Sequence, residues 1–191
     1  MRDRSEPGKP LWLTETGQAA CGGSPWAPTF RDTFRYVDQM ARLARLGVKV
    51  IAHNTLAASD YGLIDGDTLV PRPSYWAALL WRRLMGTTVL ESPVVSAPGM
   101  RTYAHCLRGD ANGVAVLAEN LGDTAQRLTL RGRVTVFVMT ASSLDSGSVA
   151  INGRQVRVGT EGSLPKIMGE RIGRVINLPA HSISFLSVGK V

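Results

Sequence analysis

Short apolar runs alternate with helical periodicity along the first half of the chain. Leu11 to Glu15 (LWLTE) and Val48 to His53 (VKVIAH) are runs of the kind expected for strands buried on both faces of a parallel sheet. Between and after these runs, residues 30–46 and 75–85 repeat their apolar positions at helical spacing. The order of strand, helix, strand and helix predicts a parallel α/β unit.

The residues at the ends of the helical segments agree with these positions. Thr29 and Asp32 form a capping-box pattern at the start of the first helix, and Gly47 ends it after about 17 residues. Ser74 is expected to cap the second helix, which Gly86 stops.

The second half of the chain has a different pattern, with short strand-like runs at spacings of about 8 to 12 residues. These runs cover residues 101–107, 114–120, 127–130, 134–140, 174–178 and 182–188. Asn152-Gly153, between two further short runs, is a type I′ hairpin signal. The pattern predicts a β-sandwich. We therefore expect an α/β plus all-β protein, with one domain over residues 1–87 and a β-sandwich domain over residues 88–191.

The α/β half is too small to stand alone, because two strands and two helices can neither close a sheet nor cover both of its faces. The composition is otherwise that of a globular protein: of 191 residues, 44% are hydrophobic and 19% charged. No apolar stretch approaches the roughly 18 residues of a membrane-spanning helix. The first ten residues, MRDRSEPGKP, lack the apolar run of a secretion signal. The sequence leaves the compartment open, a secreted or periplasmic parent protein being one option.

The charge balance favours acidic partners without choosing among them. Lys and Arg number 22 against 15 Asp and Glu, a net charge of +7 that is spread over the whole chain. No nucleic-acid-binding motif accompanies this charge, so nucleic acid is not an expected partner. Cys21 and Cys106 stand in unlike contexts and predict neither a disulfide framework nor a metal site. We expect no metal or organic cofactor.

Candidate site residues follow the two predicted parallel strands. Glu15 ends the first strand, whereas His53, Asp60 and Tyr61 lie at the end of the second strand or in the loop after it. The carboxyl ends of parallel strands meet at one rim, where α/β folds display catalytic groups. A glutamate in this position is also a common ion-pair partner, so position alone leaves both roles open.

The loop after Glu15 contains the pair Gly22-Gly23. Its backbone N–H groups could bind an anion, but without further context the pair is more typical of a tight turn with positive φ. The residues leave these alternatives open.

Five segments in a fixed order carry a family resemblance that covers nearly the whole chain: WLTETGQAACGG, DTFRYVDQMARLARLGV, HNTLAASDYGLID, PRPSYWAALLWRRLMGTTVL and RTYAHC. Together they resemble glycoside hydrolase family 79, the heparanase and β-glucuronidase family, and its bacterial heparanase-like members above all. The resemblance implies a (β/α)8 barrel with an appended β-sandwich that hydrolyses β-linked glucuronides with retention of configuration. Leu11 to Glu15 would be the seventh barrel strand and Val48 to His53 the eighth.

The resemblance also implies roles for individual residues. Glu15 matches the catalytic nucleophile, Tyr61 matches a tyrosine that contacts the uronate carboxylate, and Gly22 falls where backbone N–H groups face that carboxylate. His53 and Asn54 stand where animal heparanases have a different polar pair. With Gly23 and Asp60, these residues form the expected substrate site.

The family's second carboxyl group has no counterpart in the sequence. The general acid/base of the family is the Glu of an Asn-Glu pair, and no Asn in this chain precedes a Glu. The expectation is thus a C-terminal fragment, with the last two β/α units of the barrel and the sandwich, inactive without the N-terminal barrel portion. Its substrate would be a glucuronide or a glycan containing glucuronic acid. Two alternatives stay open: a non-catalytic sandwich module that binds acidic glycans, and a subunit that completes a separately encoded barrel.

Overall fold

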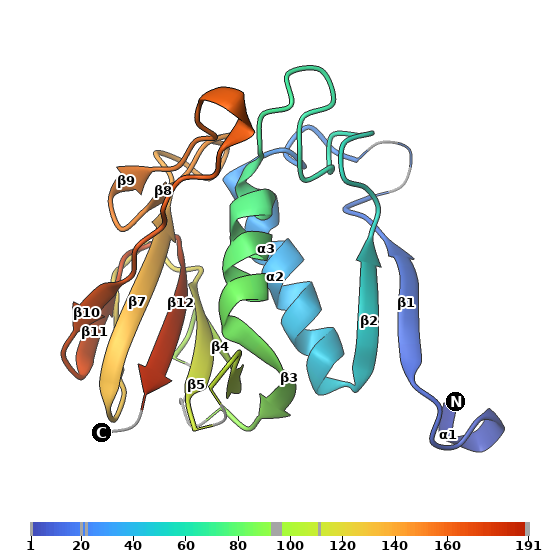
Figure 1. The fold of residues 1–191 in the computed structure, drawn as a ribbon, viewed down its shortest axis with the longest axis horizontal. Helices are drawn as coiled ribbons and strands as arrows, with labels where there is room; N and C mark the ends of the chain where they lie inside the picture. Colours follow the sequence, from blue (N-terminus) through green and yellow to red (C-terminus); the bar gives the residue numbers. More distant parts are fainter. Residues whose placement is uncertain (1, 20, 22, 93–96, 111, 190–191) are drawn as a thin grey trace.

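The computed structural model describes residues 2–19, 21, 23–92, 97–110 and 112–189. Its secondary-structure elements are stacked in layers (Figure 1). A ribbon of β1 (Leu11–Thr16) and β2 (Val48–His53) lies against helices α2 (Phe30–Arg45) and α3 (Pro73–Leu84), which lie in turn against a large sheet (Figure 1). A four-residue helix, α1 (Arg2–Ser5), precedes the ribbon. None of the described helices is both long and apolar enough to cross a membrane.

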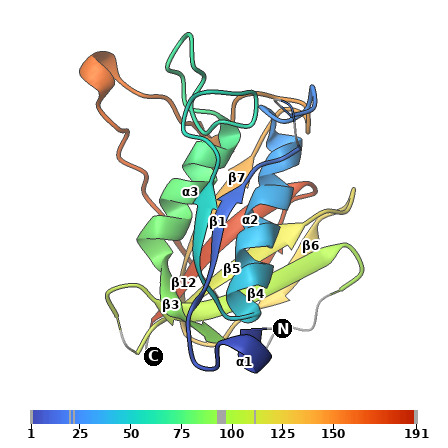
Figure 2. The same cartoon turned by 90° about the vertical axis from the view of Figure 1, so that its right-hand side faces the viewer.

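The predicted parallel pairing of the first two strands is confirmed. β1 and β2 are parallel neighbours, with Leu11 opposite Val48 and Thr16 opposite His53. The prediction that they are buried on both faces is wrong for the described chain, because Leu11 is 42% and Trp12 58% exposed. Figure 2 shows the ribbon in front of the helices, which cover only one of its sides.

The helices begin close to the predicted positions but are capped differently. The Thr29 hydroxyl donates a hydrogen bond to the carbonyl of Trp26 at 2.6 Å, and no side chain caps the first turn of α2. Ser74 is not the cap of α3, because Arg72 occupies the N-cap position and Pro73 is the first helical residue. Proline suits that position, since its fixed φ is helical and its missing N–H would have no partner there.

The second half of the chain forms the large sheet and a small one. In the large sheet the order is β3-β4-β5-β12-β7-β8-β9, with β10 also paired to β7. Its strands are β3 (Met85–Leu90), β4 (Met100–Leu107), β5 (Val114–Asn120), β7 (Arg133–Thr140), β8 (Ala150–Ile151), β9 (Arg154–Gln155), β10 (Glu170–Ile172) and β12 (Ser182–Gly189). β6 (Gln126–Thr129) and β11 (Val175–Leu178) form the small sheet, and a short 3₁₀ helix covers Thr160–Gly162.

Most strands of this half match the sequence prediction to within one or two residues. The hairpin between β8 and β9 is also confirmed, because Asn152 (φ 49°) and Gly153 (φ 72°) both have the positive φ of a type I′ turn. The division at residues 87 and 88 remains a prediction, and β3 spans that point.

Each face of the large sheet packs against a different layer. Helices α2 and α3 share one core with it, built mainly from aromatic and aliphatic side chains that include Phe30, Trp76, Leu80, Leu117, Phe137 and Phe185. The opposite face packs against the β6–β11 sheet through a second apolar cluster. The helices are therefore held on the large sheet, and they in turn support the β1–β2 ribbon.

Candidate active site

The ends of β1 and β2 bring two of the expected site residues into contact. Glu15 lies near the end of β1 and Asn54 directly follows β2, and the Asn54 amide Nδ2 donates a hydrogen bond to Glu15 Oε1 at 2.8 Å. The backbone fixes this pair, because the Asn54 N–H also donates to the Thr16 carbonyl at 2.7 Å. Glu15 is exposed, so its second carboxylate oxygen is open to a ligand.

His53 lies beside this pair, half-buried between two tyrosines. Its ring makes edge contacts with Tyr36 at 5.0 Å and Tyr61 at 6.4 Å between centroids. His53 Nε2 lies 2.9 Å from the carbonyl oxygen of Tyr61, which can only accept, so Nε2 carries the proton. Burial lowers the pKa of His53 and favours the neutral ring. Its Nδ1 is buried without a hydrogen-bond partner among the described residues.

Tyr61 packs against two glycines of the loop that follows β1. A Cβ atom on Gly17 would lie 3.1 Å from Tyr61 Cε2, and one on Gly23 would lie 2.9 Å from Tyr61 Cδ1. Gly23 also has a φ of +96°, which favours glycine. Of the predicted Gly22-Gly23 pair, Gly23 therefore contacts the tyrosine, while Gly22 lies outside the described residues.

Asp60 is exposed, and its backbone takes part in a contact that sequence reasoning missed. Arg72 Nη1 donates to the carbonyls of Ser59, Asp60 and Gly62 at 2.5, 2.7 and 3.2 Å, and its Nη2 lies 3.0 Å from Asp65 Oδ2. One guanidinium thereby shapes the loop that carries Asp60 and Tyr61. Hydrogen bonds from Thr68 and Arg72 lower the pKa of Asp65 to about 2.

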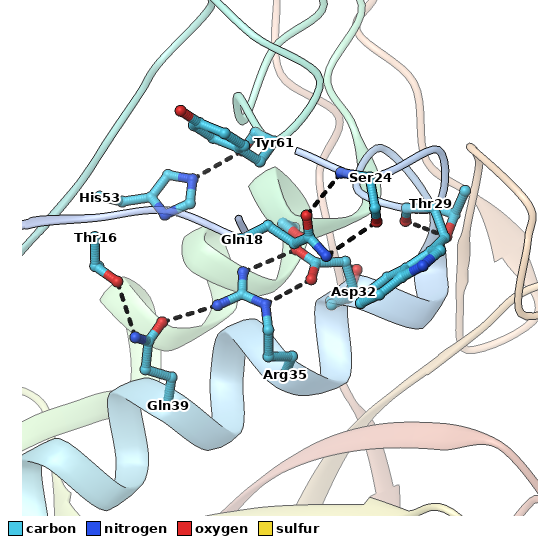
Figure 3. Close-up of polar contacts among 12 residues, drawn as sticks. Thr16, Gln18, Ser24, Thr29, Asp32, Arg35, Gln39, His53 and Tyr61 are labelled. Atoms are coloured by element: carbon cyan, nitrogen blue, oxygen red, sulfur yellow. Dashed lines mark hydrogen bonds and ion pairs between the residues drawn. The ribbon is translucent and has the colours of Figure 1, made fainter. Parts of the chain in front are cut away.

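A second unpredicted network connects α2 with the end of β1 (Figure 3). Asp32 is buried and accepts two hydrogen bonds from Arg35 at 2.6 and 2.9 Å. Arg35 also donates to Gln39 at 2.9 Å, and Gln39 donates to the Thr16 hydroxyl at 2.9 Å. Thr16 follows Glu15, so this chain of contacts fixes the strand next to the carboxylate.

The Gln18 side chain holds the β1–α2 loop closed. Gln18 Oε1 accepts a hydrogen bond from the Ser24 N–H at 2.9 Å, and its Nε2 donates to the Ser24 hydroxyl at 3.0 Å (Figure 3). No sequence pattern marks Gln18 or Arg72, because each bond depends on how a loop folds back on itself.

The arrangement offers one exposed carboxylate that accepts a hydrogen bond from an amide, at the end of β1 that pairs with the end of β2. An ionised carboxylate in this setting can act as a nucleophile or stabilise a developing positive charge. Within the described ranges, no group of three or more His, Cys, Asp or Glu side chains is arranged to hold a metal ion.

Comparison with known proteins shows what the chain is similar to. No family model matches the chain. Heparanase-like protein 1 of Arabidopsis thaliana is 44% identical over 59% of the chain and 21% of its own length. Heparanase of Gallus gallus is 33% identical over 94% of the chain and 38% of its own length. Baicalin-β-D-glucuronidase of Scutellaria baicalensis is 30% identical over 82% of the chain and 31% of its own length. The chain thus spans well under half of the relatives that it matches.

Solved structures of glycoside hydrolases share the fold. A 4-O-α-L-rhamnosyl-β-D-glucuronidase from Fusarium oxysporum has a TM-score of 0.69 at 16% identity, over 95% of this chain and 44% of that one. A family 30 xylanase from Clostridium acetobutylicum has a TM-score of 0.63 at 15% identity, over 96% of this chain and 43% of that one. The arrangement of ribbon, helices and sheets therefore recurs as part of larger hydrolases.

Proposed function

This chain belongs to the heparanase and β-glucuronidase family, glycoside hydrolase family 79, and we propose that it is the nucleophile-bearing C-terminal part of a retaining β-glucuronidase. The observation that carries the proposal is the contact between Glu15 and Asn54 at the ends of two parallel strands. The chain covers 38% or less of these three relatives, so the activity belongs to the longer protein.

Glu15 is the nucleophile in the first step of the proposed reaction. Asn54 donates to Oε1, which leaves Oε2 free to attack the anomeric carbon of the bound glucuronide. The C–O bond to the leaving group breaks as the ester to Glu15 forms, and a carboxylic acid gives its proton to the departing oxygen. Water then attacks the anomeric carbon, gives its proton to that second carboxyl group and releases Glu15. The second carboxyl group comes from the remainder of the longer protein, about 5 to 5.5 Å from Glu15.

Recognition of the acidic sugar falls to the loops beside Glu15. Tyr61 offers a hydroxyl group, and we assign the backbone N–H of Gly23, which lies against the tyrosine ring, as a second donor. Hydrogen bonds from such donors to a carboxylate are stronger than those between neutral groups. His53 supports this surface because its Nε2–H holds the Tyr61 carbonyl.

Replacement of the nucleophile in the longer protein tests the proposal. Glu15→Gln keeps the shape of the side chain but removes the attacking oxygen, so turnover of an aryl β-glucuronide should fall about a thousandfold or more while binding survives. Glu6→Gln, which alters an exposed partner of Lys9, is the matched control and should leave turnover unchanged. An active Glu15→Gln enzyme would show that the nucleophile is another residue.

The isolated chain provides a second arm of the same experiment. Without the second carboxyl group it loses acid assistance worth about 10² to 10⁴ in rate, and we expect no measurable hydrolysis. Robust turnover by the purified chain, abolished by Glu15→Gln, would contradict the assignment of the acid to the rest of the protein.

A further inference from the structure

Arg72 occupies a position at the start of α3 that the helix itself does not explain. It is the N-cap residue, where Ser, Thr, Asp, Asn and Gly are preferred, and its side chain makes no capping hydrogen bond. The side chain is only 11% exposed, so its charge is largely removed from water. Burial of a cation is costly unless the cation is paired and hydrogen-bonded. The role of Arg72 therefore lies in its contacts with the loop and not in the helix.

These contacts lie on both sides of Tyr61. Arg72 Nη1 donates to the carbonyls of Ser59 and Asp60, before the tyrosine, and of Gly62, after it, at 2.5, 2.7 and 3.2 Å. One nitrogen atom thus holds three carbonyl groups of a four-residue stretch. The backbone on either side of the tyrosine cannot move without breaking bonds to this guanidinium.

The fourth carbonyl of the stretch is held by a different side chain. The Tyr61 carbonyl accepts the hydrogen bond from His53 Nε2 at 2.9 Å (Figure 3). The hydroxyl end of the tyrosine ring lies beside the end of β1, because a Cβ atom on Gly17 would lie 3.2 Å from Tyr61 Cζ. Gly17 is two residues after Glu15. The backbone position of the tyrosine therefore determines where its hydroxyl lies relative to the carboxylate.

Asp65 supplies the counter-charge of the guanidinium. Its Oδ2 lies 3.0 Å from Arg72 Nη2, while its Oδ1 accepts hydrogen bonds from the Thr68 N–H and hydroxyl at 2.9 and 2.7 Å. The planar guanidinium has donors in a fixed fork, so one nitrogen can bind carbonyls while another binds the carboxylate. Asp65 thus holds Arg72 in the orientation that serves the loop.

We propose that Arg72 is a positioning residue for recognition of the acidic sugar, acting through the backbone of Tyr61. The proposal rests on the proposed function, in which the Tyr61 hydroxyl donates to the uronate carboxylate. Without the guanidinium the carbonyls around Tyr61 lose their common donor, and the hydroxyl is no longer held at hydrogen-bond distance from the substrate. A glucoside has no carboxylate, so Arg72 discriminates between glucuronide and glucoside without taking part in bond cleavage.

Arg72→Met in the longer protein tests the proposal. For an aryl β-glucuronide kcat/KM should fall about tenfold through a higher KM, while kcat and the hydrolysis of the matching glucoside change less than about twofold. Arg83→Met is the matched control, because Arg83 of the same helix donates to the Ile167 carbonyl at 2.7 Å and lies over the Phe137 ring. It should leave the preference for the glucuronide unchanged. Equal loss on both substrates with Arg72→Met would overturn the proposal.

A double variant tests whether Arg72 acts through the tyrosine. In the Tyr61→Phe protein, Arg72→Met should lower kcat/KM for the glucuronide by less than about a further twofold, because the hydroxyl that it positions is already absent. A further tenfold loss in this background would show that Arg72 acts by another route and would overturn the proposal.

Hydrogen exchange tests the position of the loop without turnover, so it separates failure of this inference from failure of the proposed function. The N–H groups of Gly62, Leu63 and Ile64 donate to carbonyls within the loop. Their exchange should quicken about tenfold in Arg72→Met and stay within about twofold of the wild type in Arg83→Met. Unchanged exchange in Arg72→Met would overturn the proposal even if Glu15→Gln left the enzyme active.

Asp65→Asn replaces Arg72→Met should that variant misfold. It weakens the hold on the guanidinium without removing it, so kcat/KM for the glucuronide should fall about threefold and that for the glucoside should not change. An unchanged glucuronide value, or the same loss on both substrates, would overturn the proposal.

Discussion

The position of Tyr61 depends on the absence of a side chain at Gly23. A Cβ atom there would lie 2.9 Å from Tyr61 Cδ1 and 3.2 Å from Ala27 Cβ, in a backbone conformation with φ +96°. We expect Gly23→Ala to lower the free energy of unfolding by about 1–2 kcal/mol from the backbone alone, and to shift the tyrosine ring. Chemical denaturation and near-UV circular dichroism measure these effects. Gly173→Ala is the control, because no atom lies within 4 Å of its Cβ, and a similar loss there would refute the argument.

The Tyr61 hydroxyl should matter only for acidic substrates. Tyr61→Phe in the longer protein removes one hydrogen bond to a charged group, worth about 1.5 to 3 kcal/mol, or roughly 10- to 150-fold in kcat/KM. The loss should appear with an aryl glucuronide and not with the matching glucoside, which has no carboxylate. Equal impairment on both substrates would mean that Tyr61 has a structural role instead.

For single residues, the sequence predicts the position of side chains at the ends of strands. It does not predict which side chains hold the loops in place. Glu15 and His53 could be expected at one rim because parallel strands end together, and the residue after each of them forms the backbone contact between Thr16 and Asn54. Asn54 was expected at the site only from the resemblance, and the structure brings its amide into hydrogen-bond contact with Glu15. Arg72 and Gln18 could not be expected, since each bonds to a nearby loop whose fold the sequence pattern does not determine. The catalytic and binding roles of the predicted residues remain predictions.

Helix α2 connects the large sheet to the ribbon that carries Glu15, and its buried Asp32–Arg35 pair is central to that connection. The Asp32 side chain is 3% exposed and that of Arg35 28%. Asp32→Asn leaves the guanidinium without its counter-charge in a poorly solvated place, so we expect a loss of about 1–3 kcal/mol in the free energy of unfolding. Chemical denaturation measures this loss.

An exposed ion pair between the same helix and the segment that connects β7 with β8 provides the control. Arg31 and Asp145 have side chains that are 46% and 66% exposed, so Asp145→Asn should cost about 0–1 kcal/mol. If Asp32→Asn costs no more than Asp145→Asn, the buried pair does not stabilise the helix against β1.

The positions of helices and strands along the chain were predicted better than their burial and their caps. The strand at 114–120 and the hairpin at Asn152-Gly153 agree with the structure because both are encoded locally, in apolar runs and turn residues. The exposure of Trp12 could not be predicted, since an apolar run does not show which element covers it. The cap of α3 was misassigned because Ser74 and Pro73 both fit a helix start, and proline took the first helical position.

On the scale of the whole molecule, α2 packs against the large sheet, and this interface contains a cluster of charged and polar side chains. Glu119 of β5 is buried, and neither carboxylate oxygen has a hydrogen-bond partner among the described residues. Facing it are Asp38 and Arg42 of α2, and Arg101 and Tyr103 of β4. Asp38 binds both arginines and accepts the Tyr103 hydroxyl, so Glu119 has no cation of its own. Burial, with a smaller effect of Asp38, raises the pKa of Glu119 to about 8.

This raised pKa predicts a pH dependence of stability with a definite sign. The folded state holds the Glu119 proton up to a pH of about 8, whereas the unfolded state releases it near its ordinary value of 4.5. The tighter binding of this proton by the folded state stabilises the fold. This stabilisation is complete below about pH 4.5, is lost as the pH rises, and is gone above about pH 8. Denaturation of the wild type and of Glu119→Gln across this range isolates the effect. Their difference in unfolding free energy should change by a few kcal/mol. A pH-independent difference would contradict it.

The position of β12 has a consequence for how the chain is made. β12 (Ser182–Gly189) is the last strand in the sequence, yet it lies between β5 and β7 and pairs with both. During synthesis the ribosome exposes β5 and β7 long before β12 emerges, and each meanwhile presents an unpaired strand edge. The large sheet, and with it the core under α2 and α3, can therefore be completed only after residue 189 has left the ribosome exit tunnel. A nascent chain stalled before residue 182 should stay sensitive to protease until translation resumes.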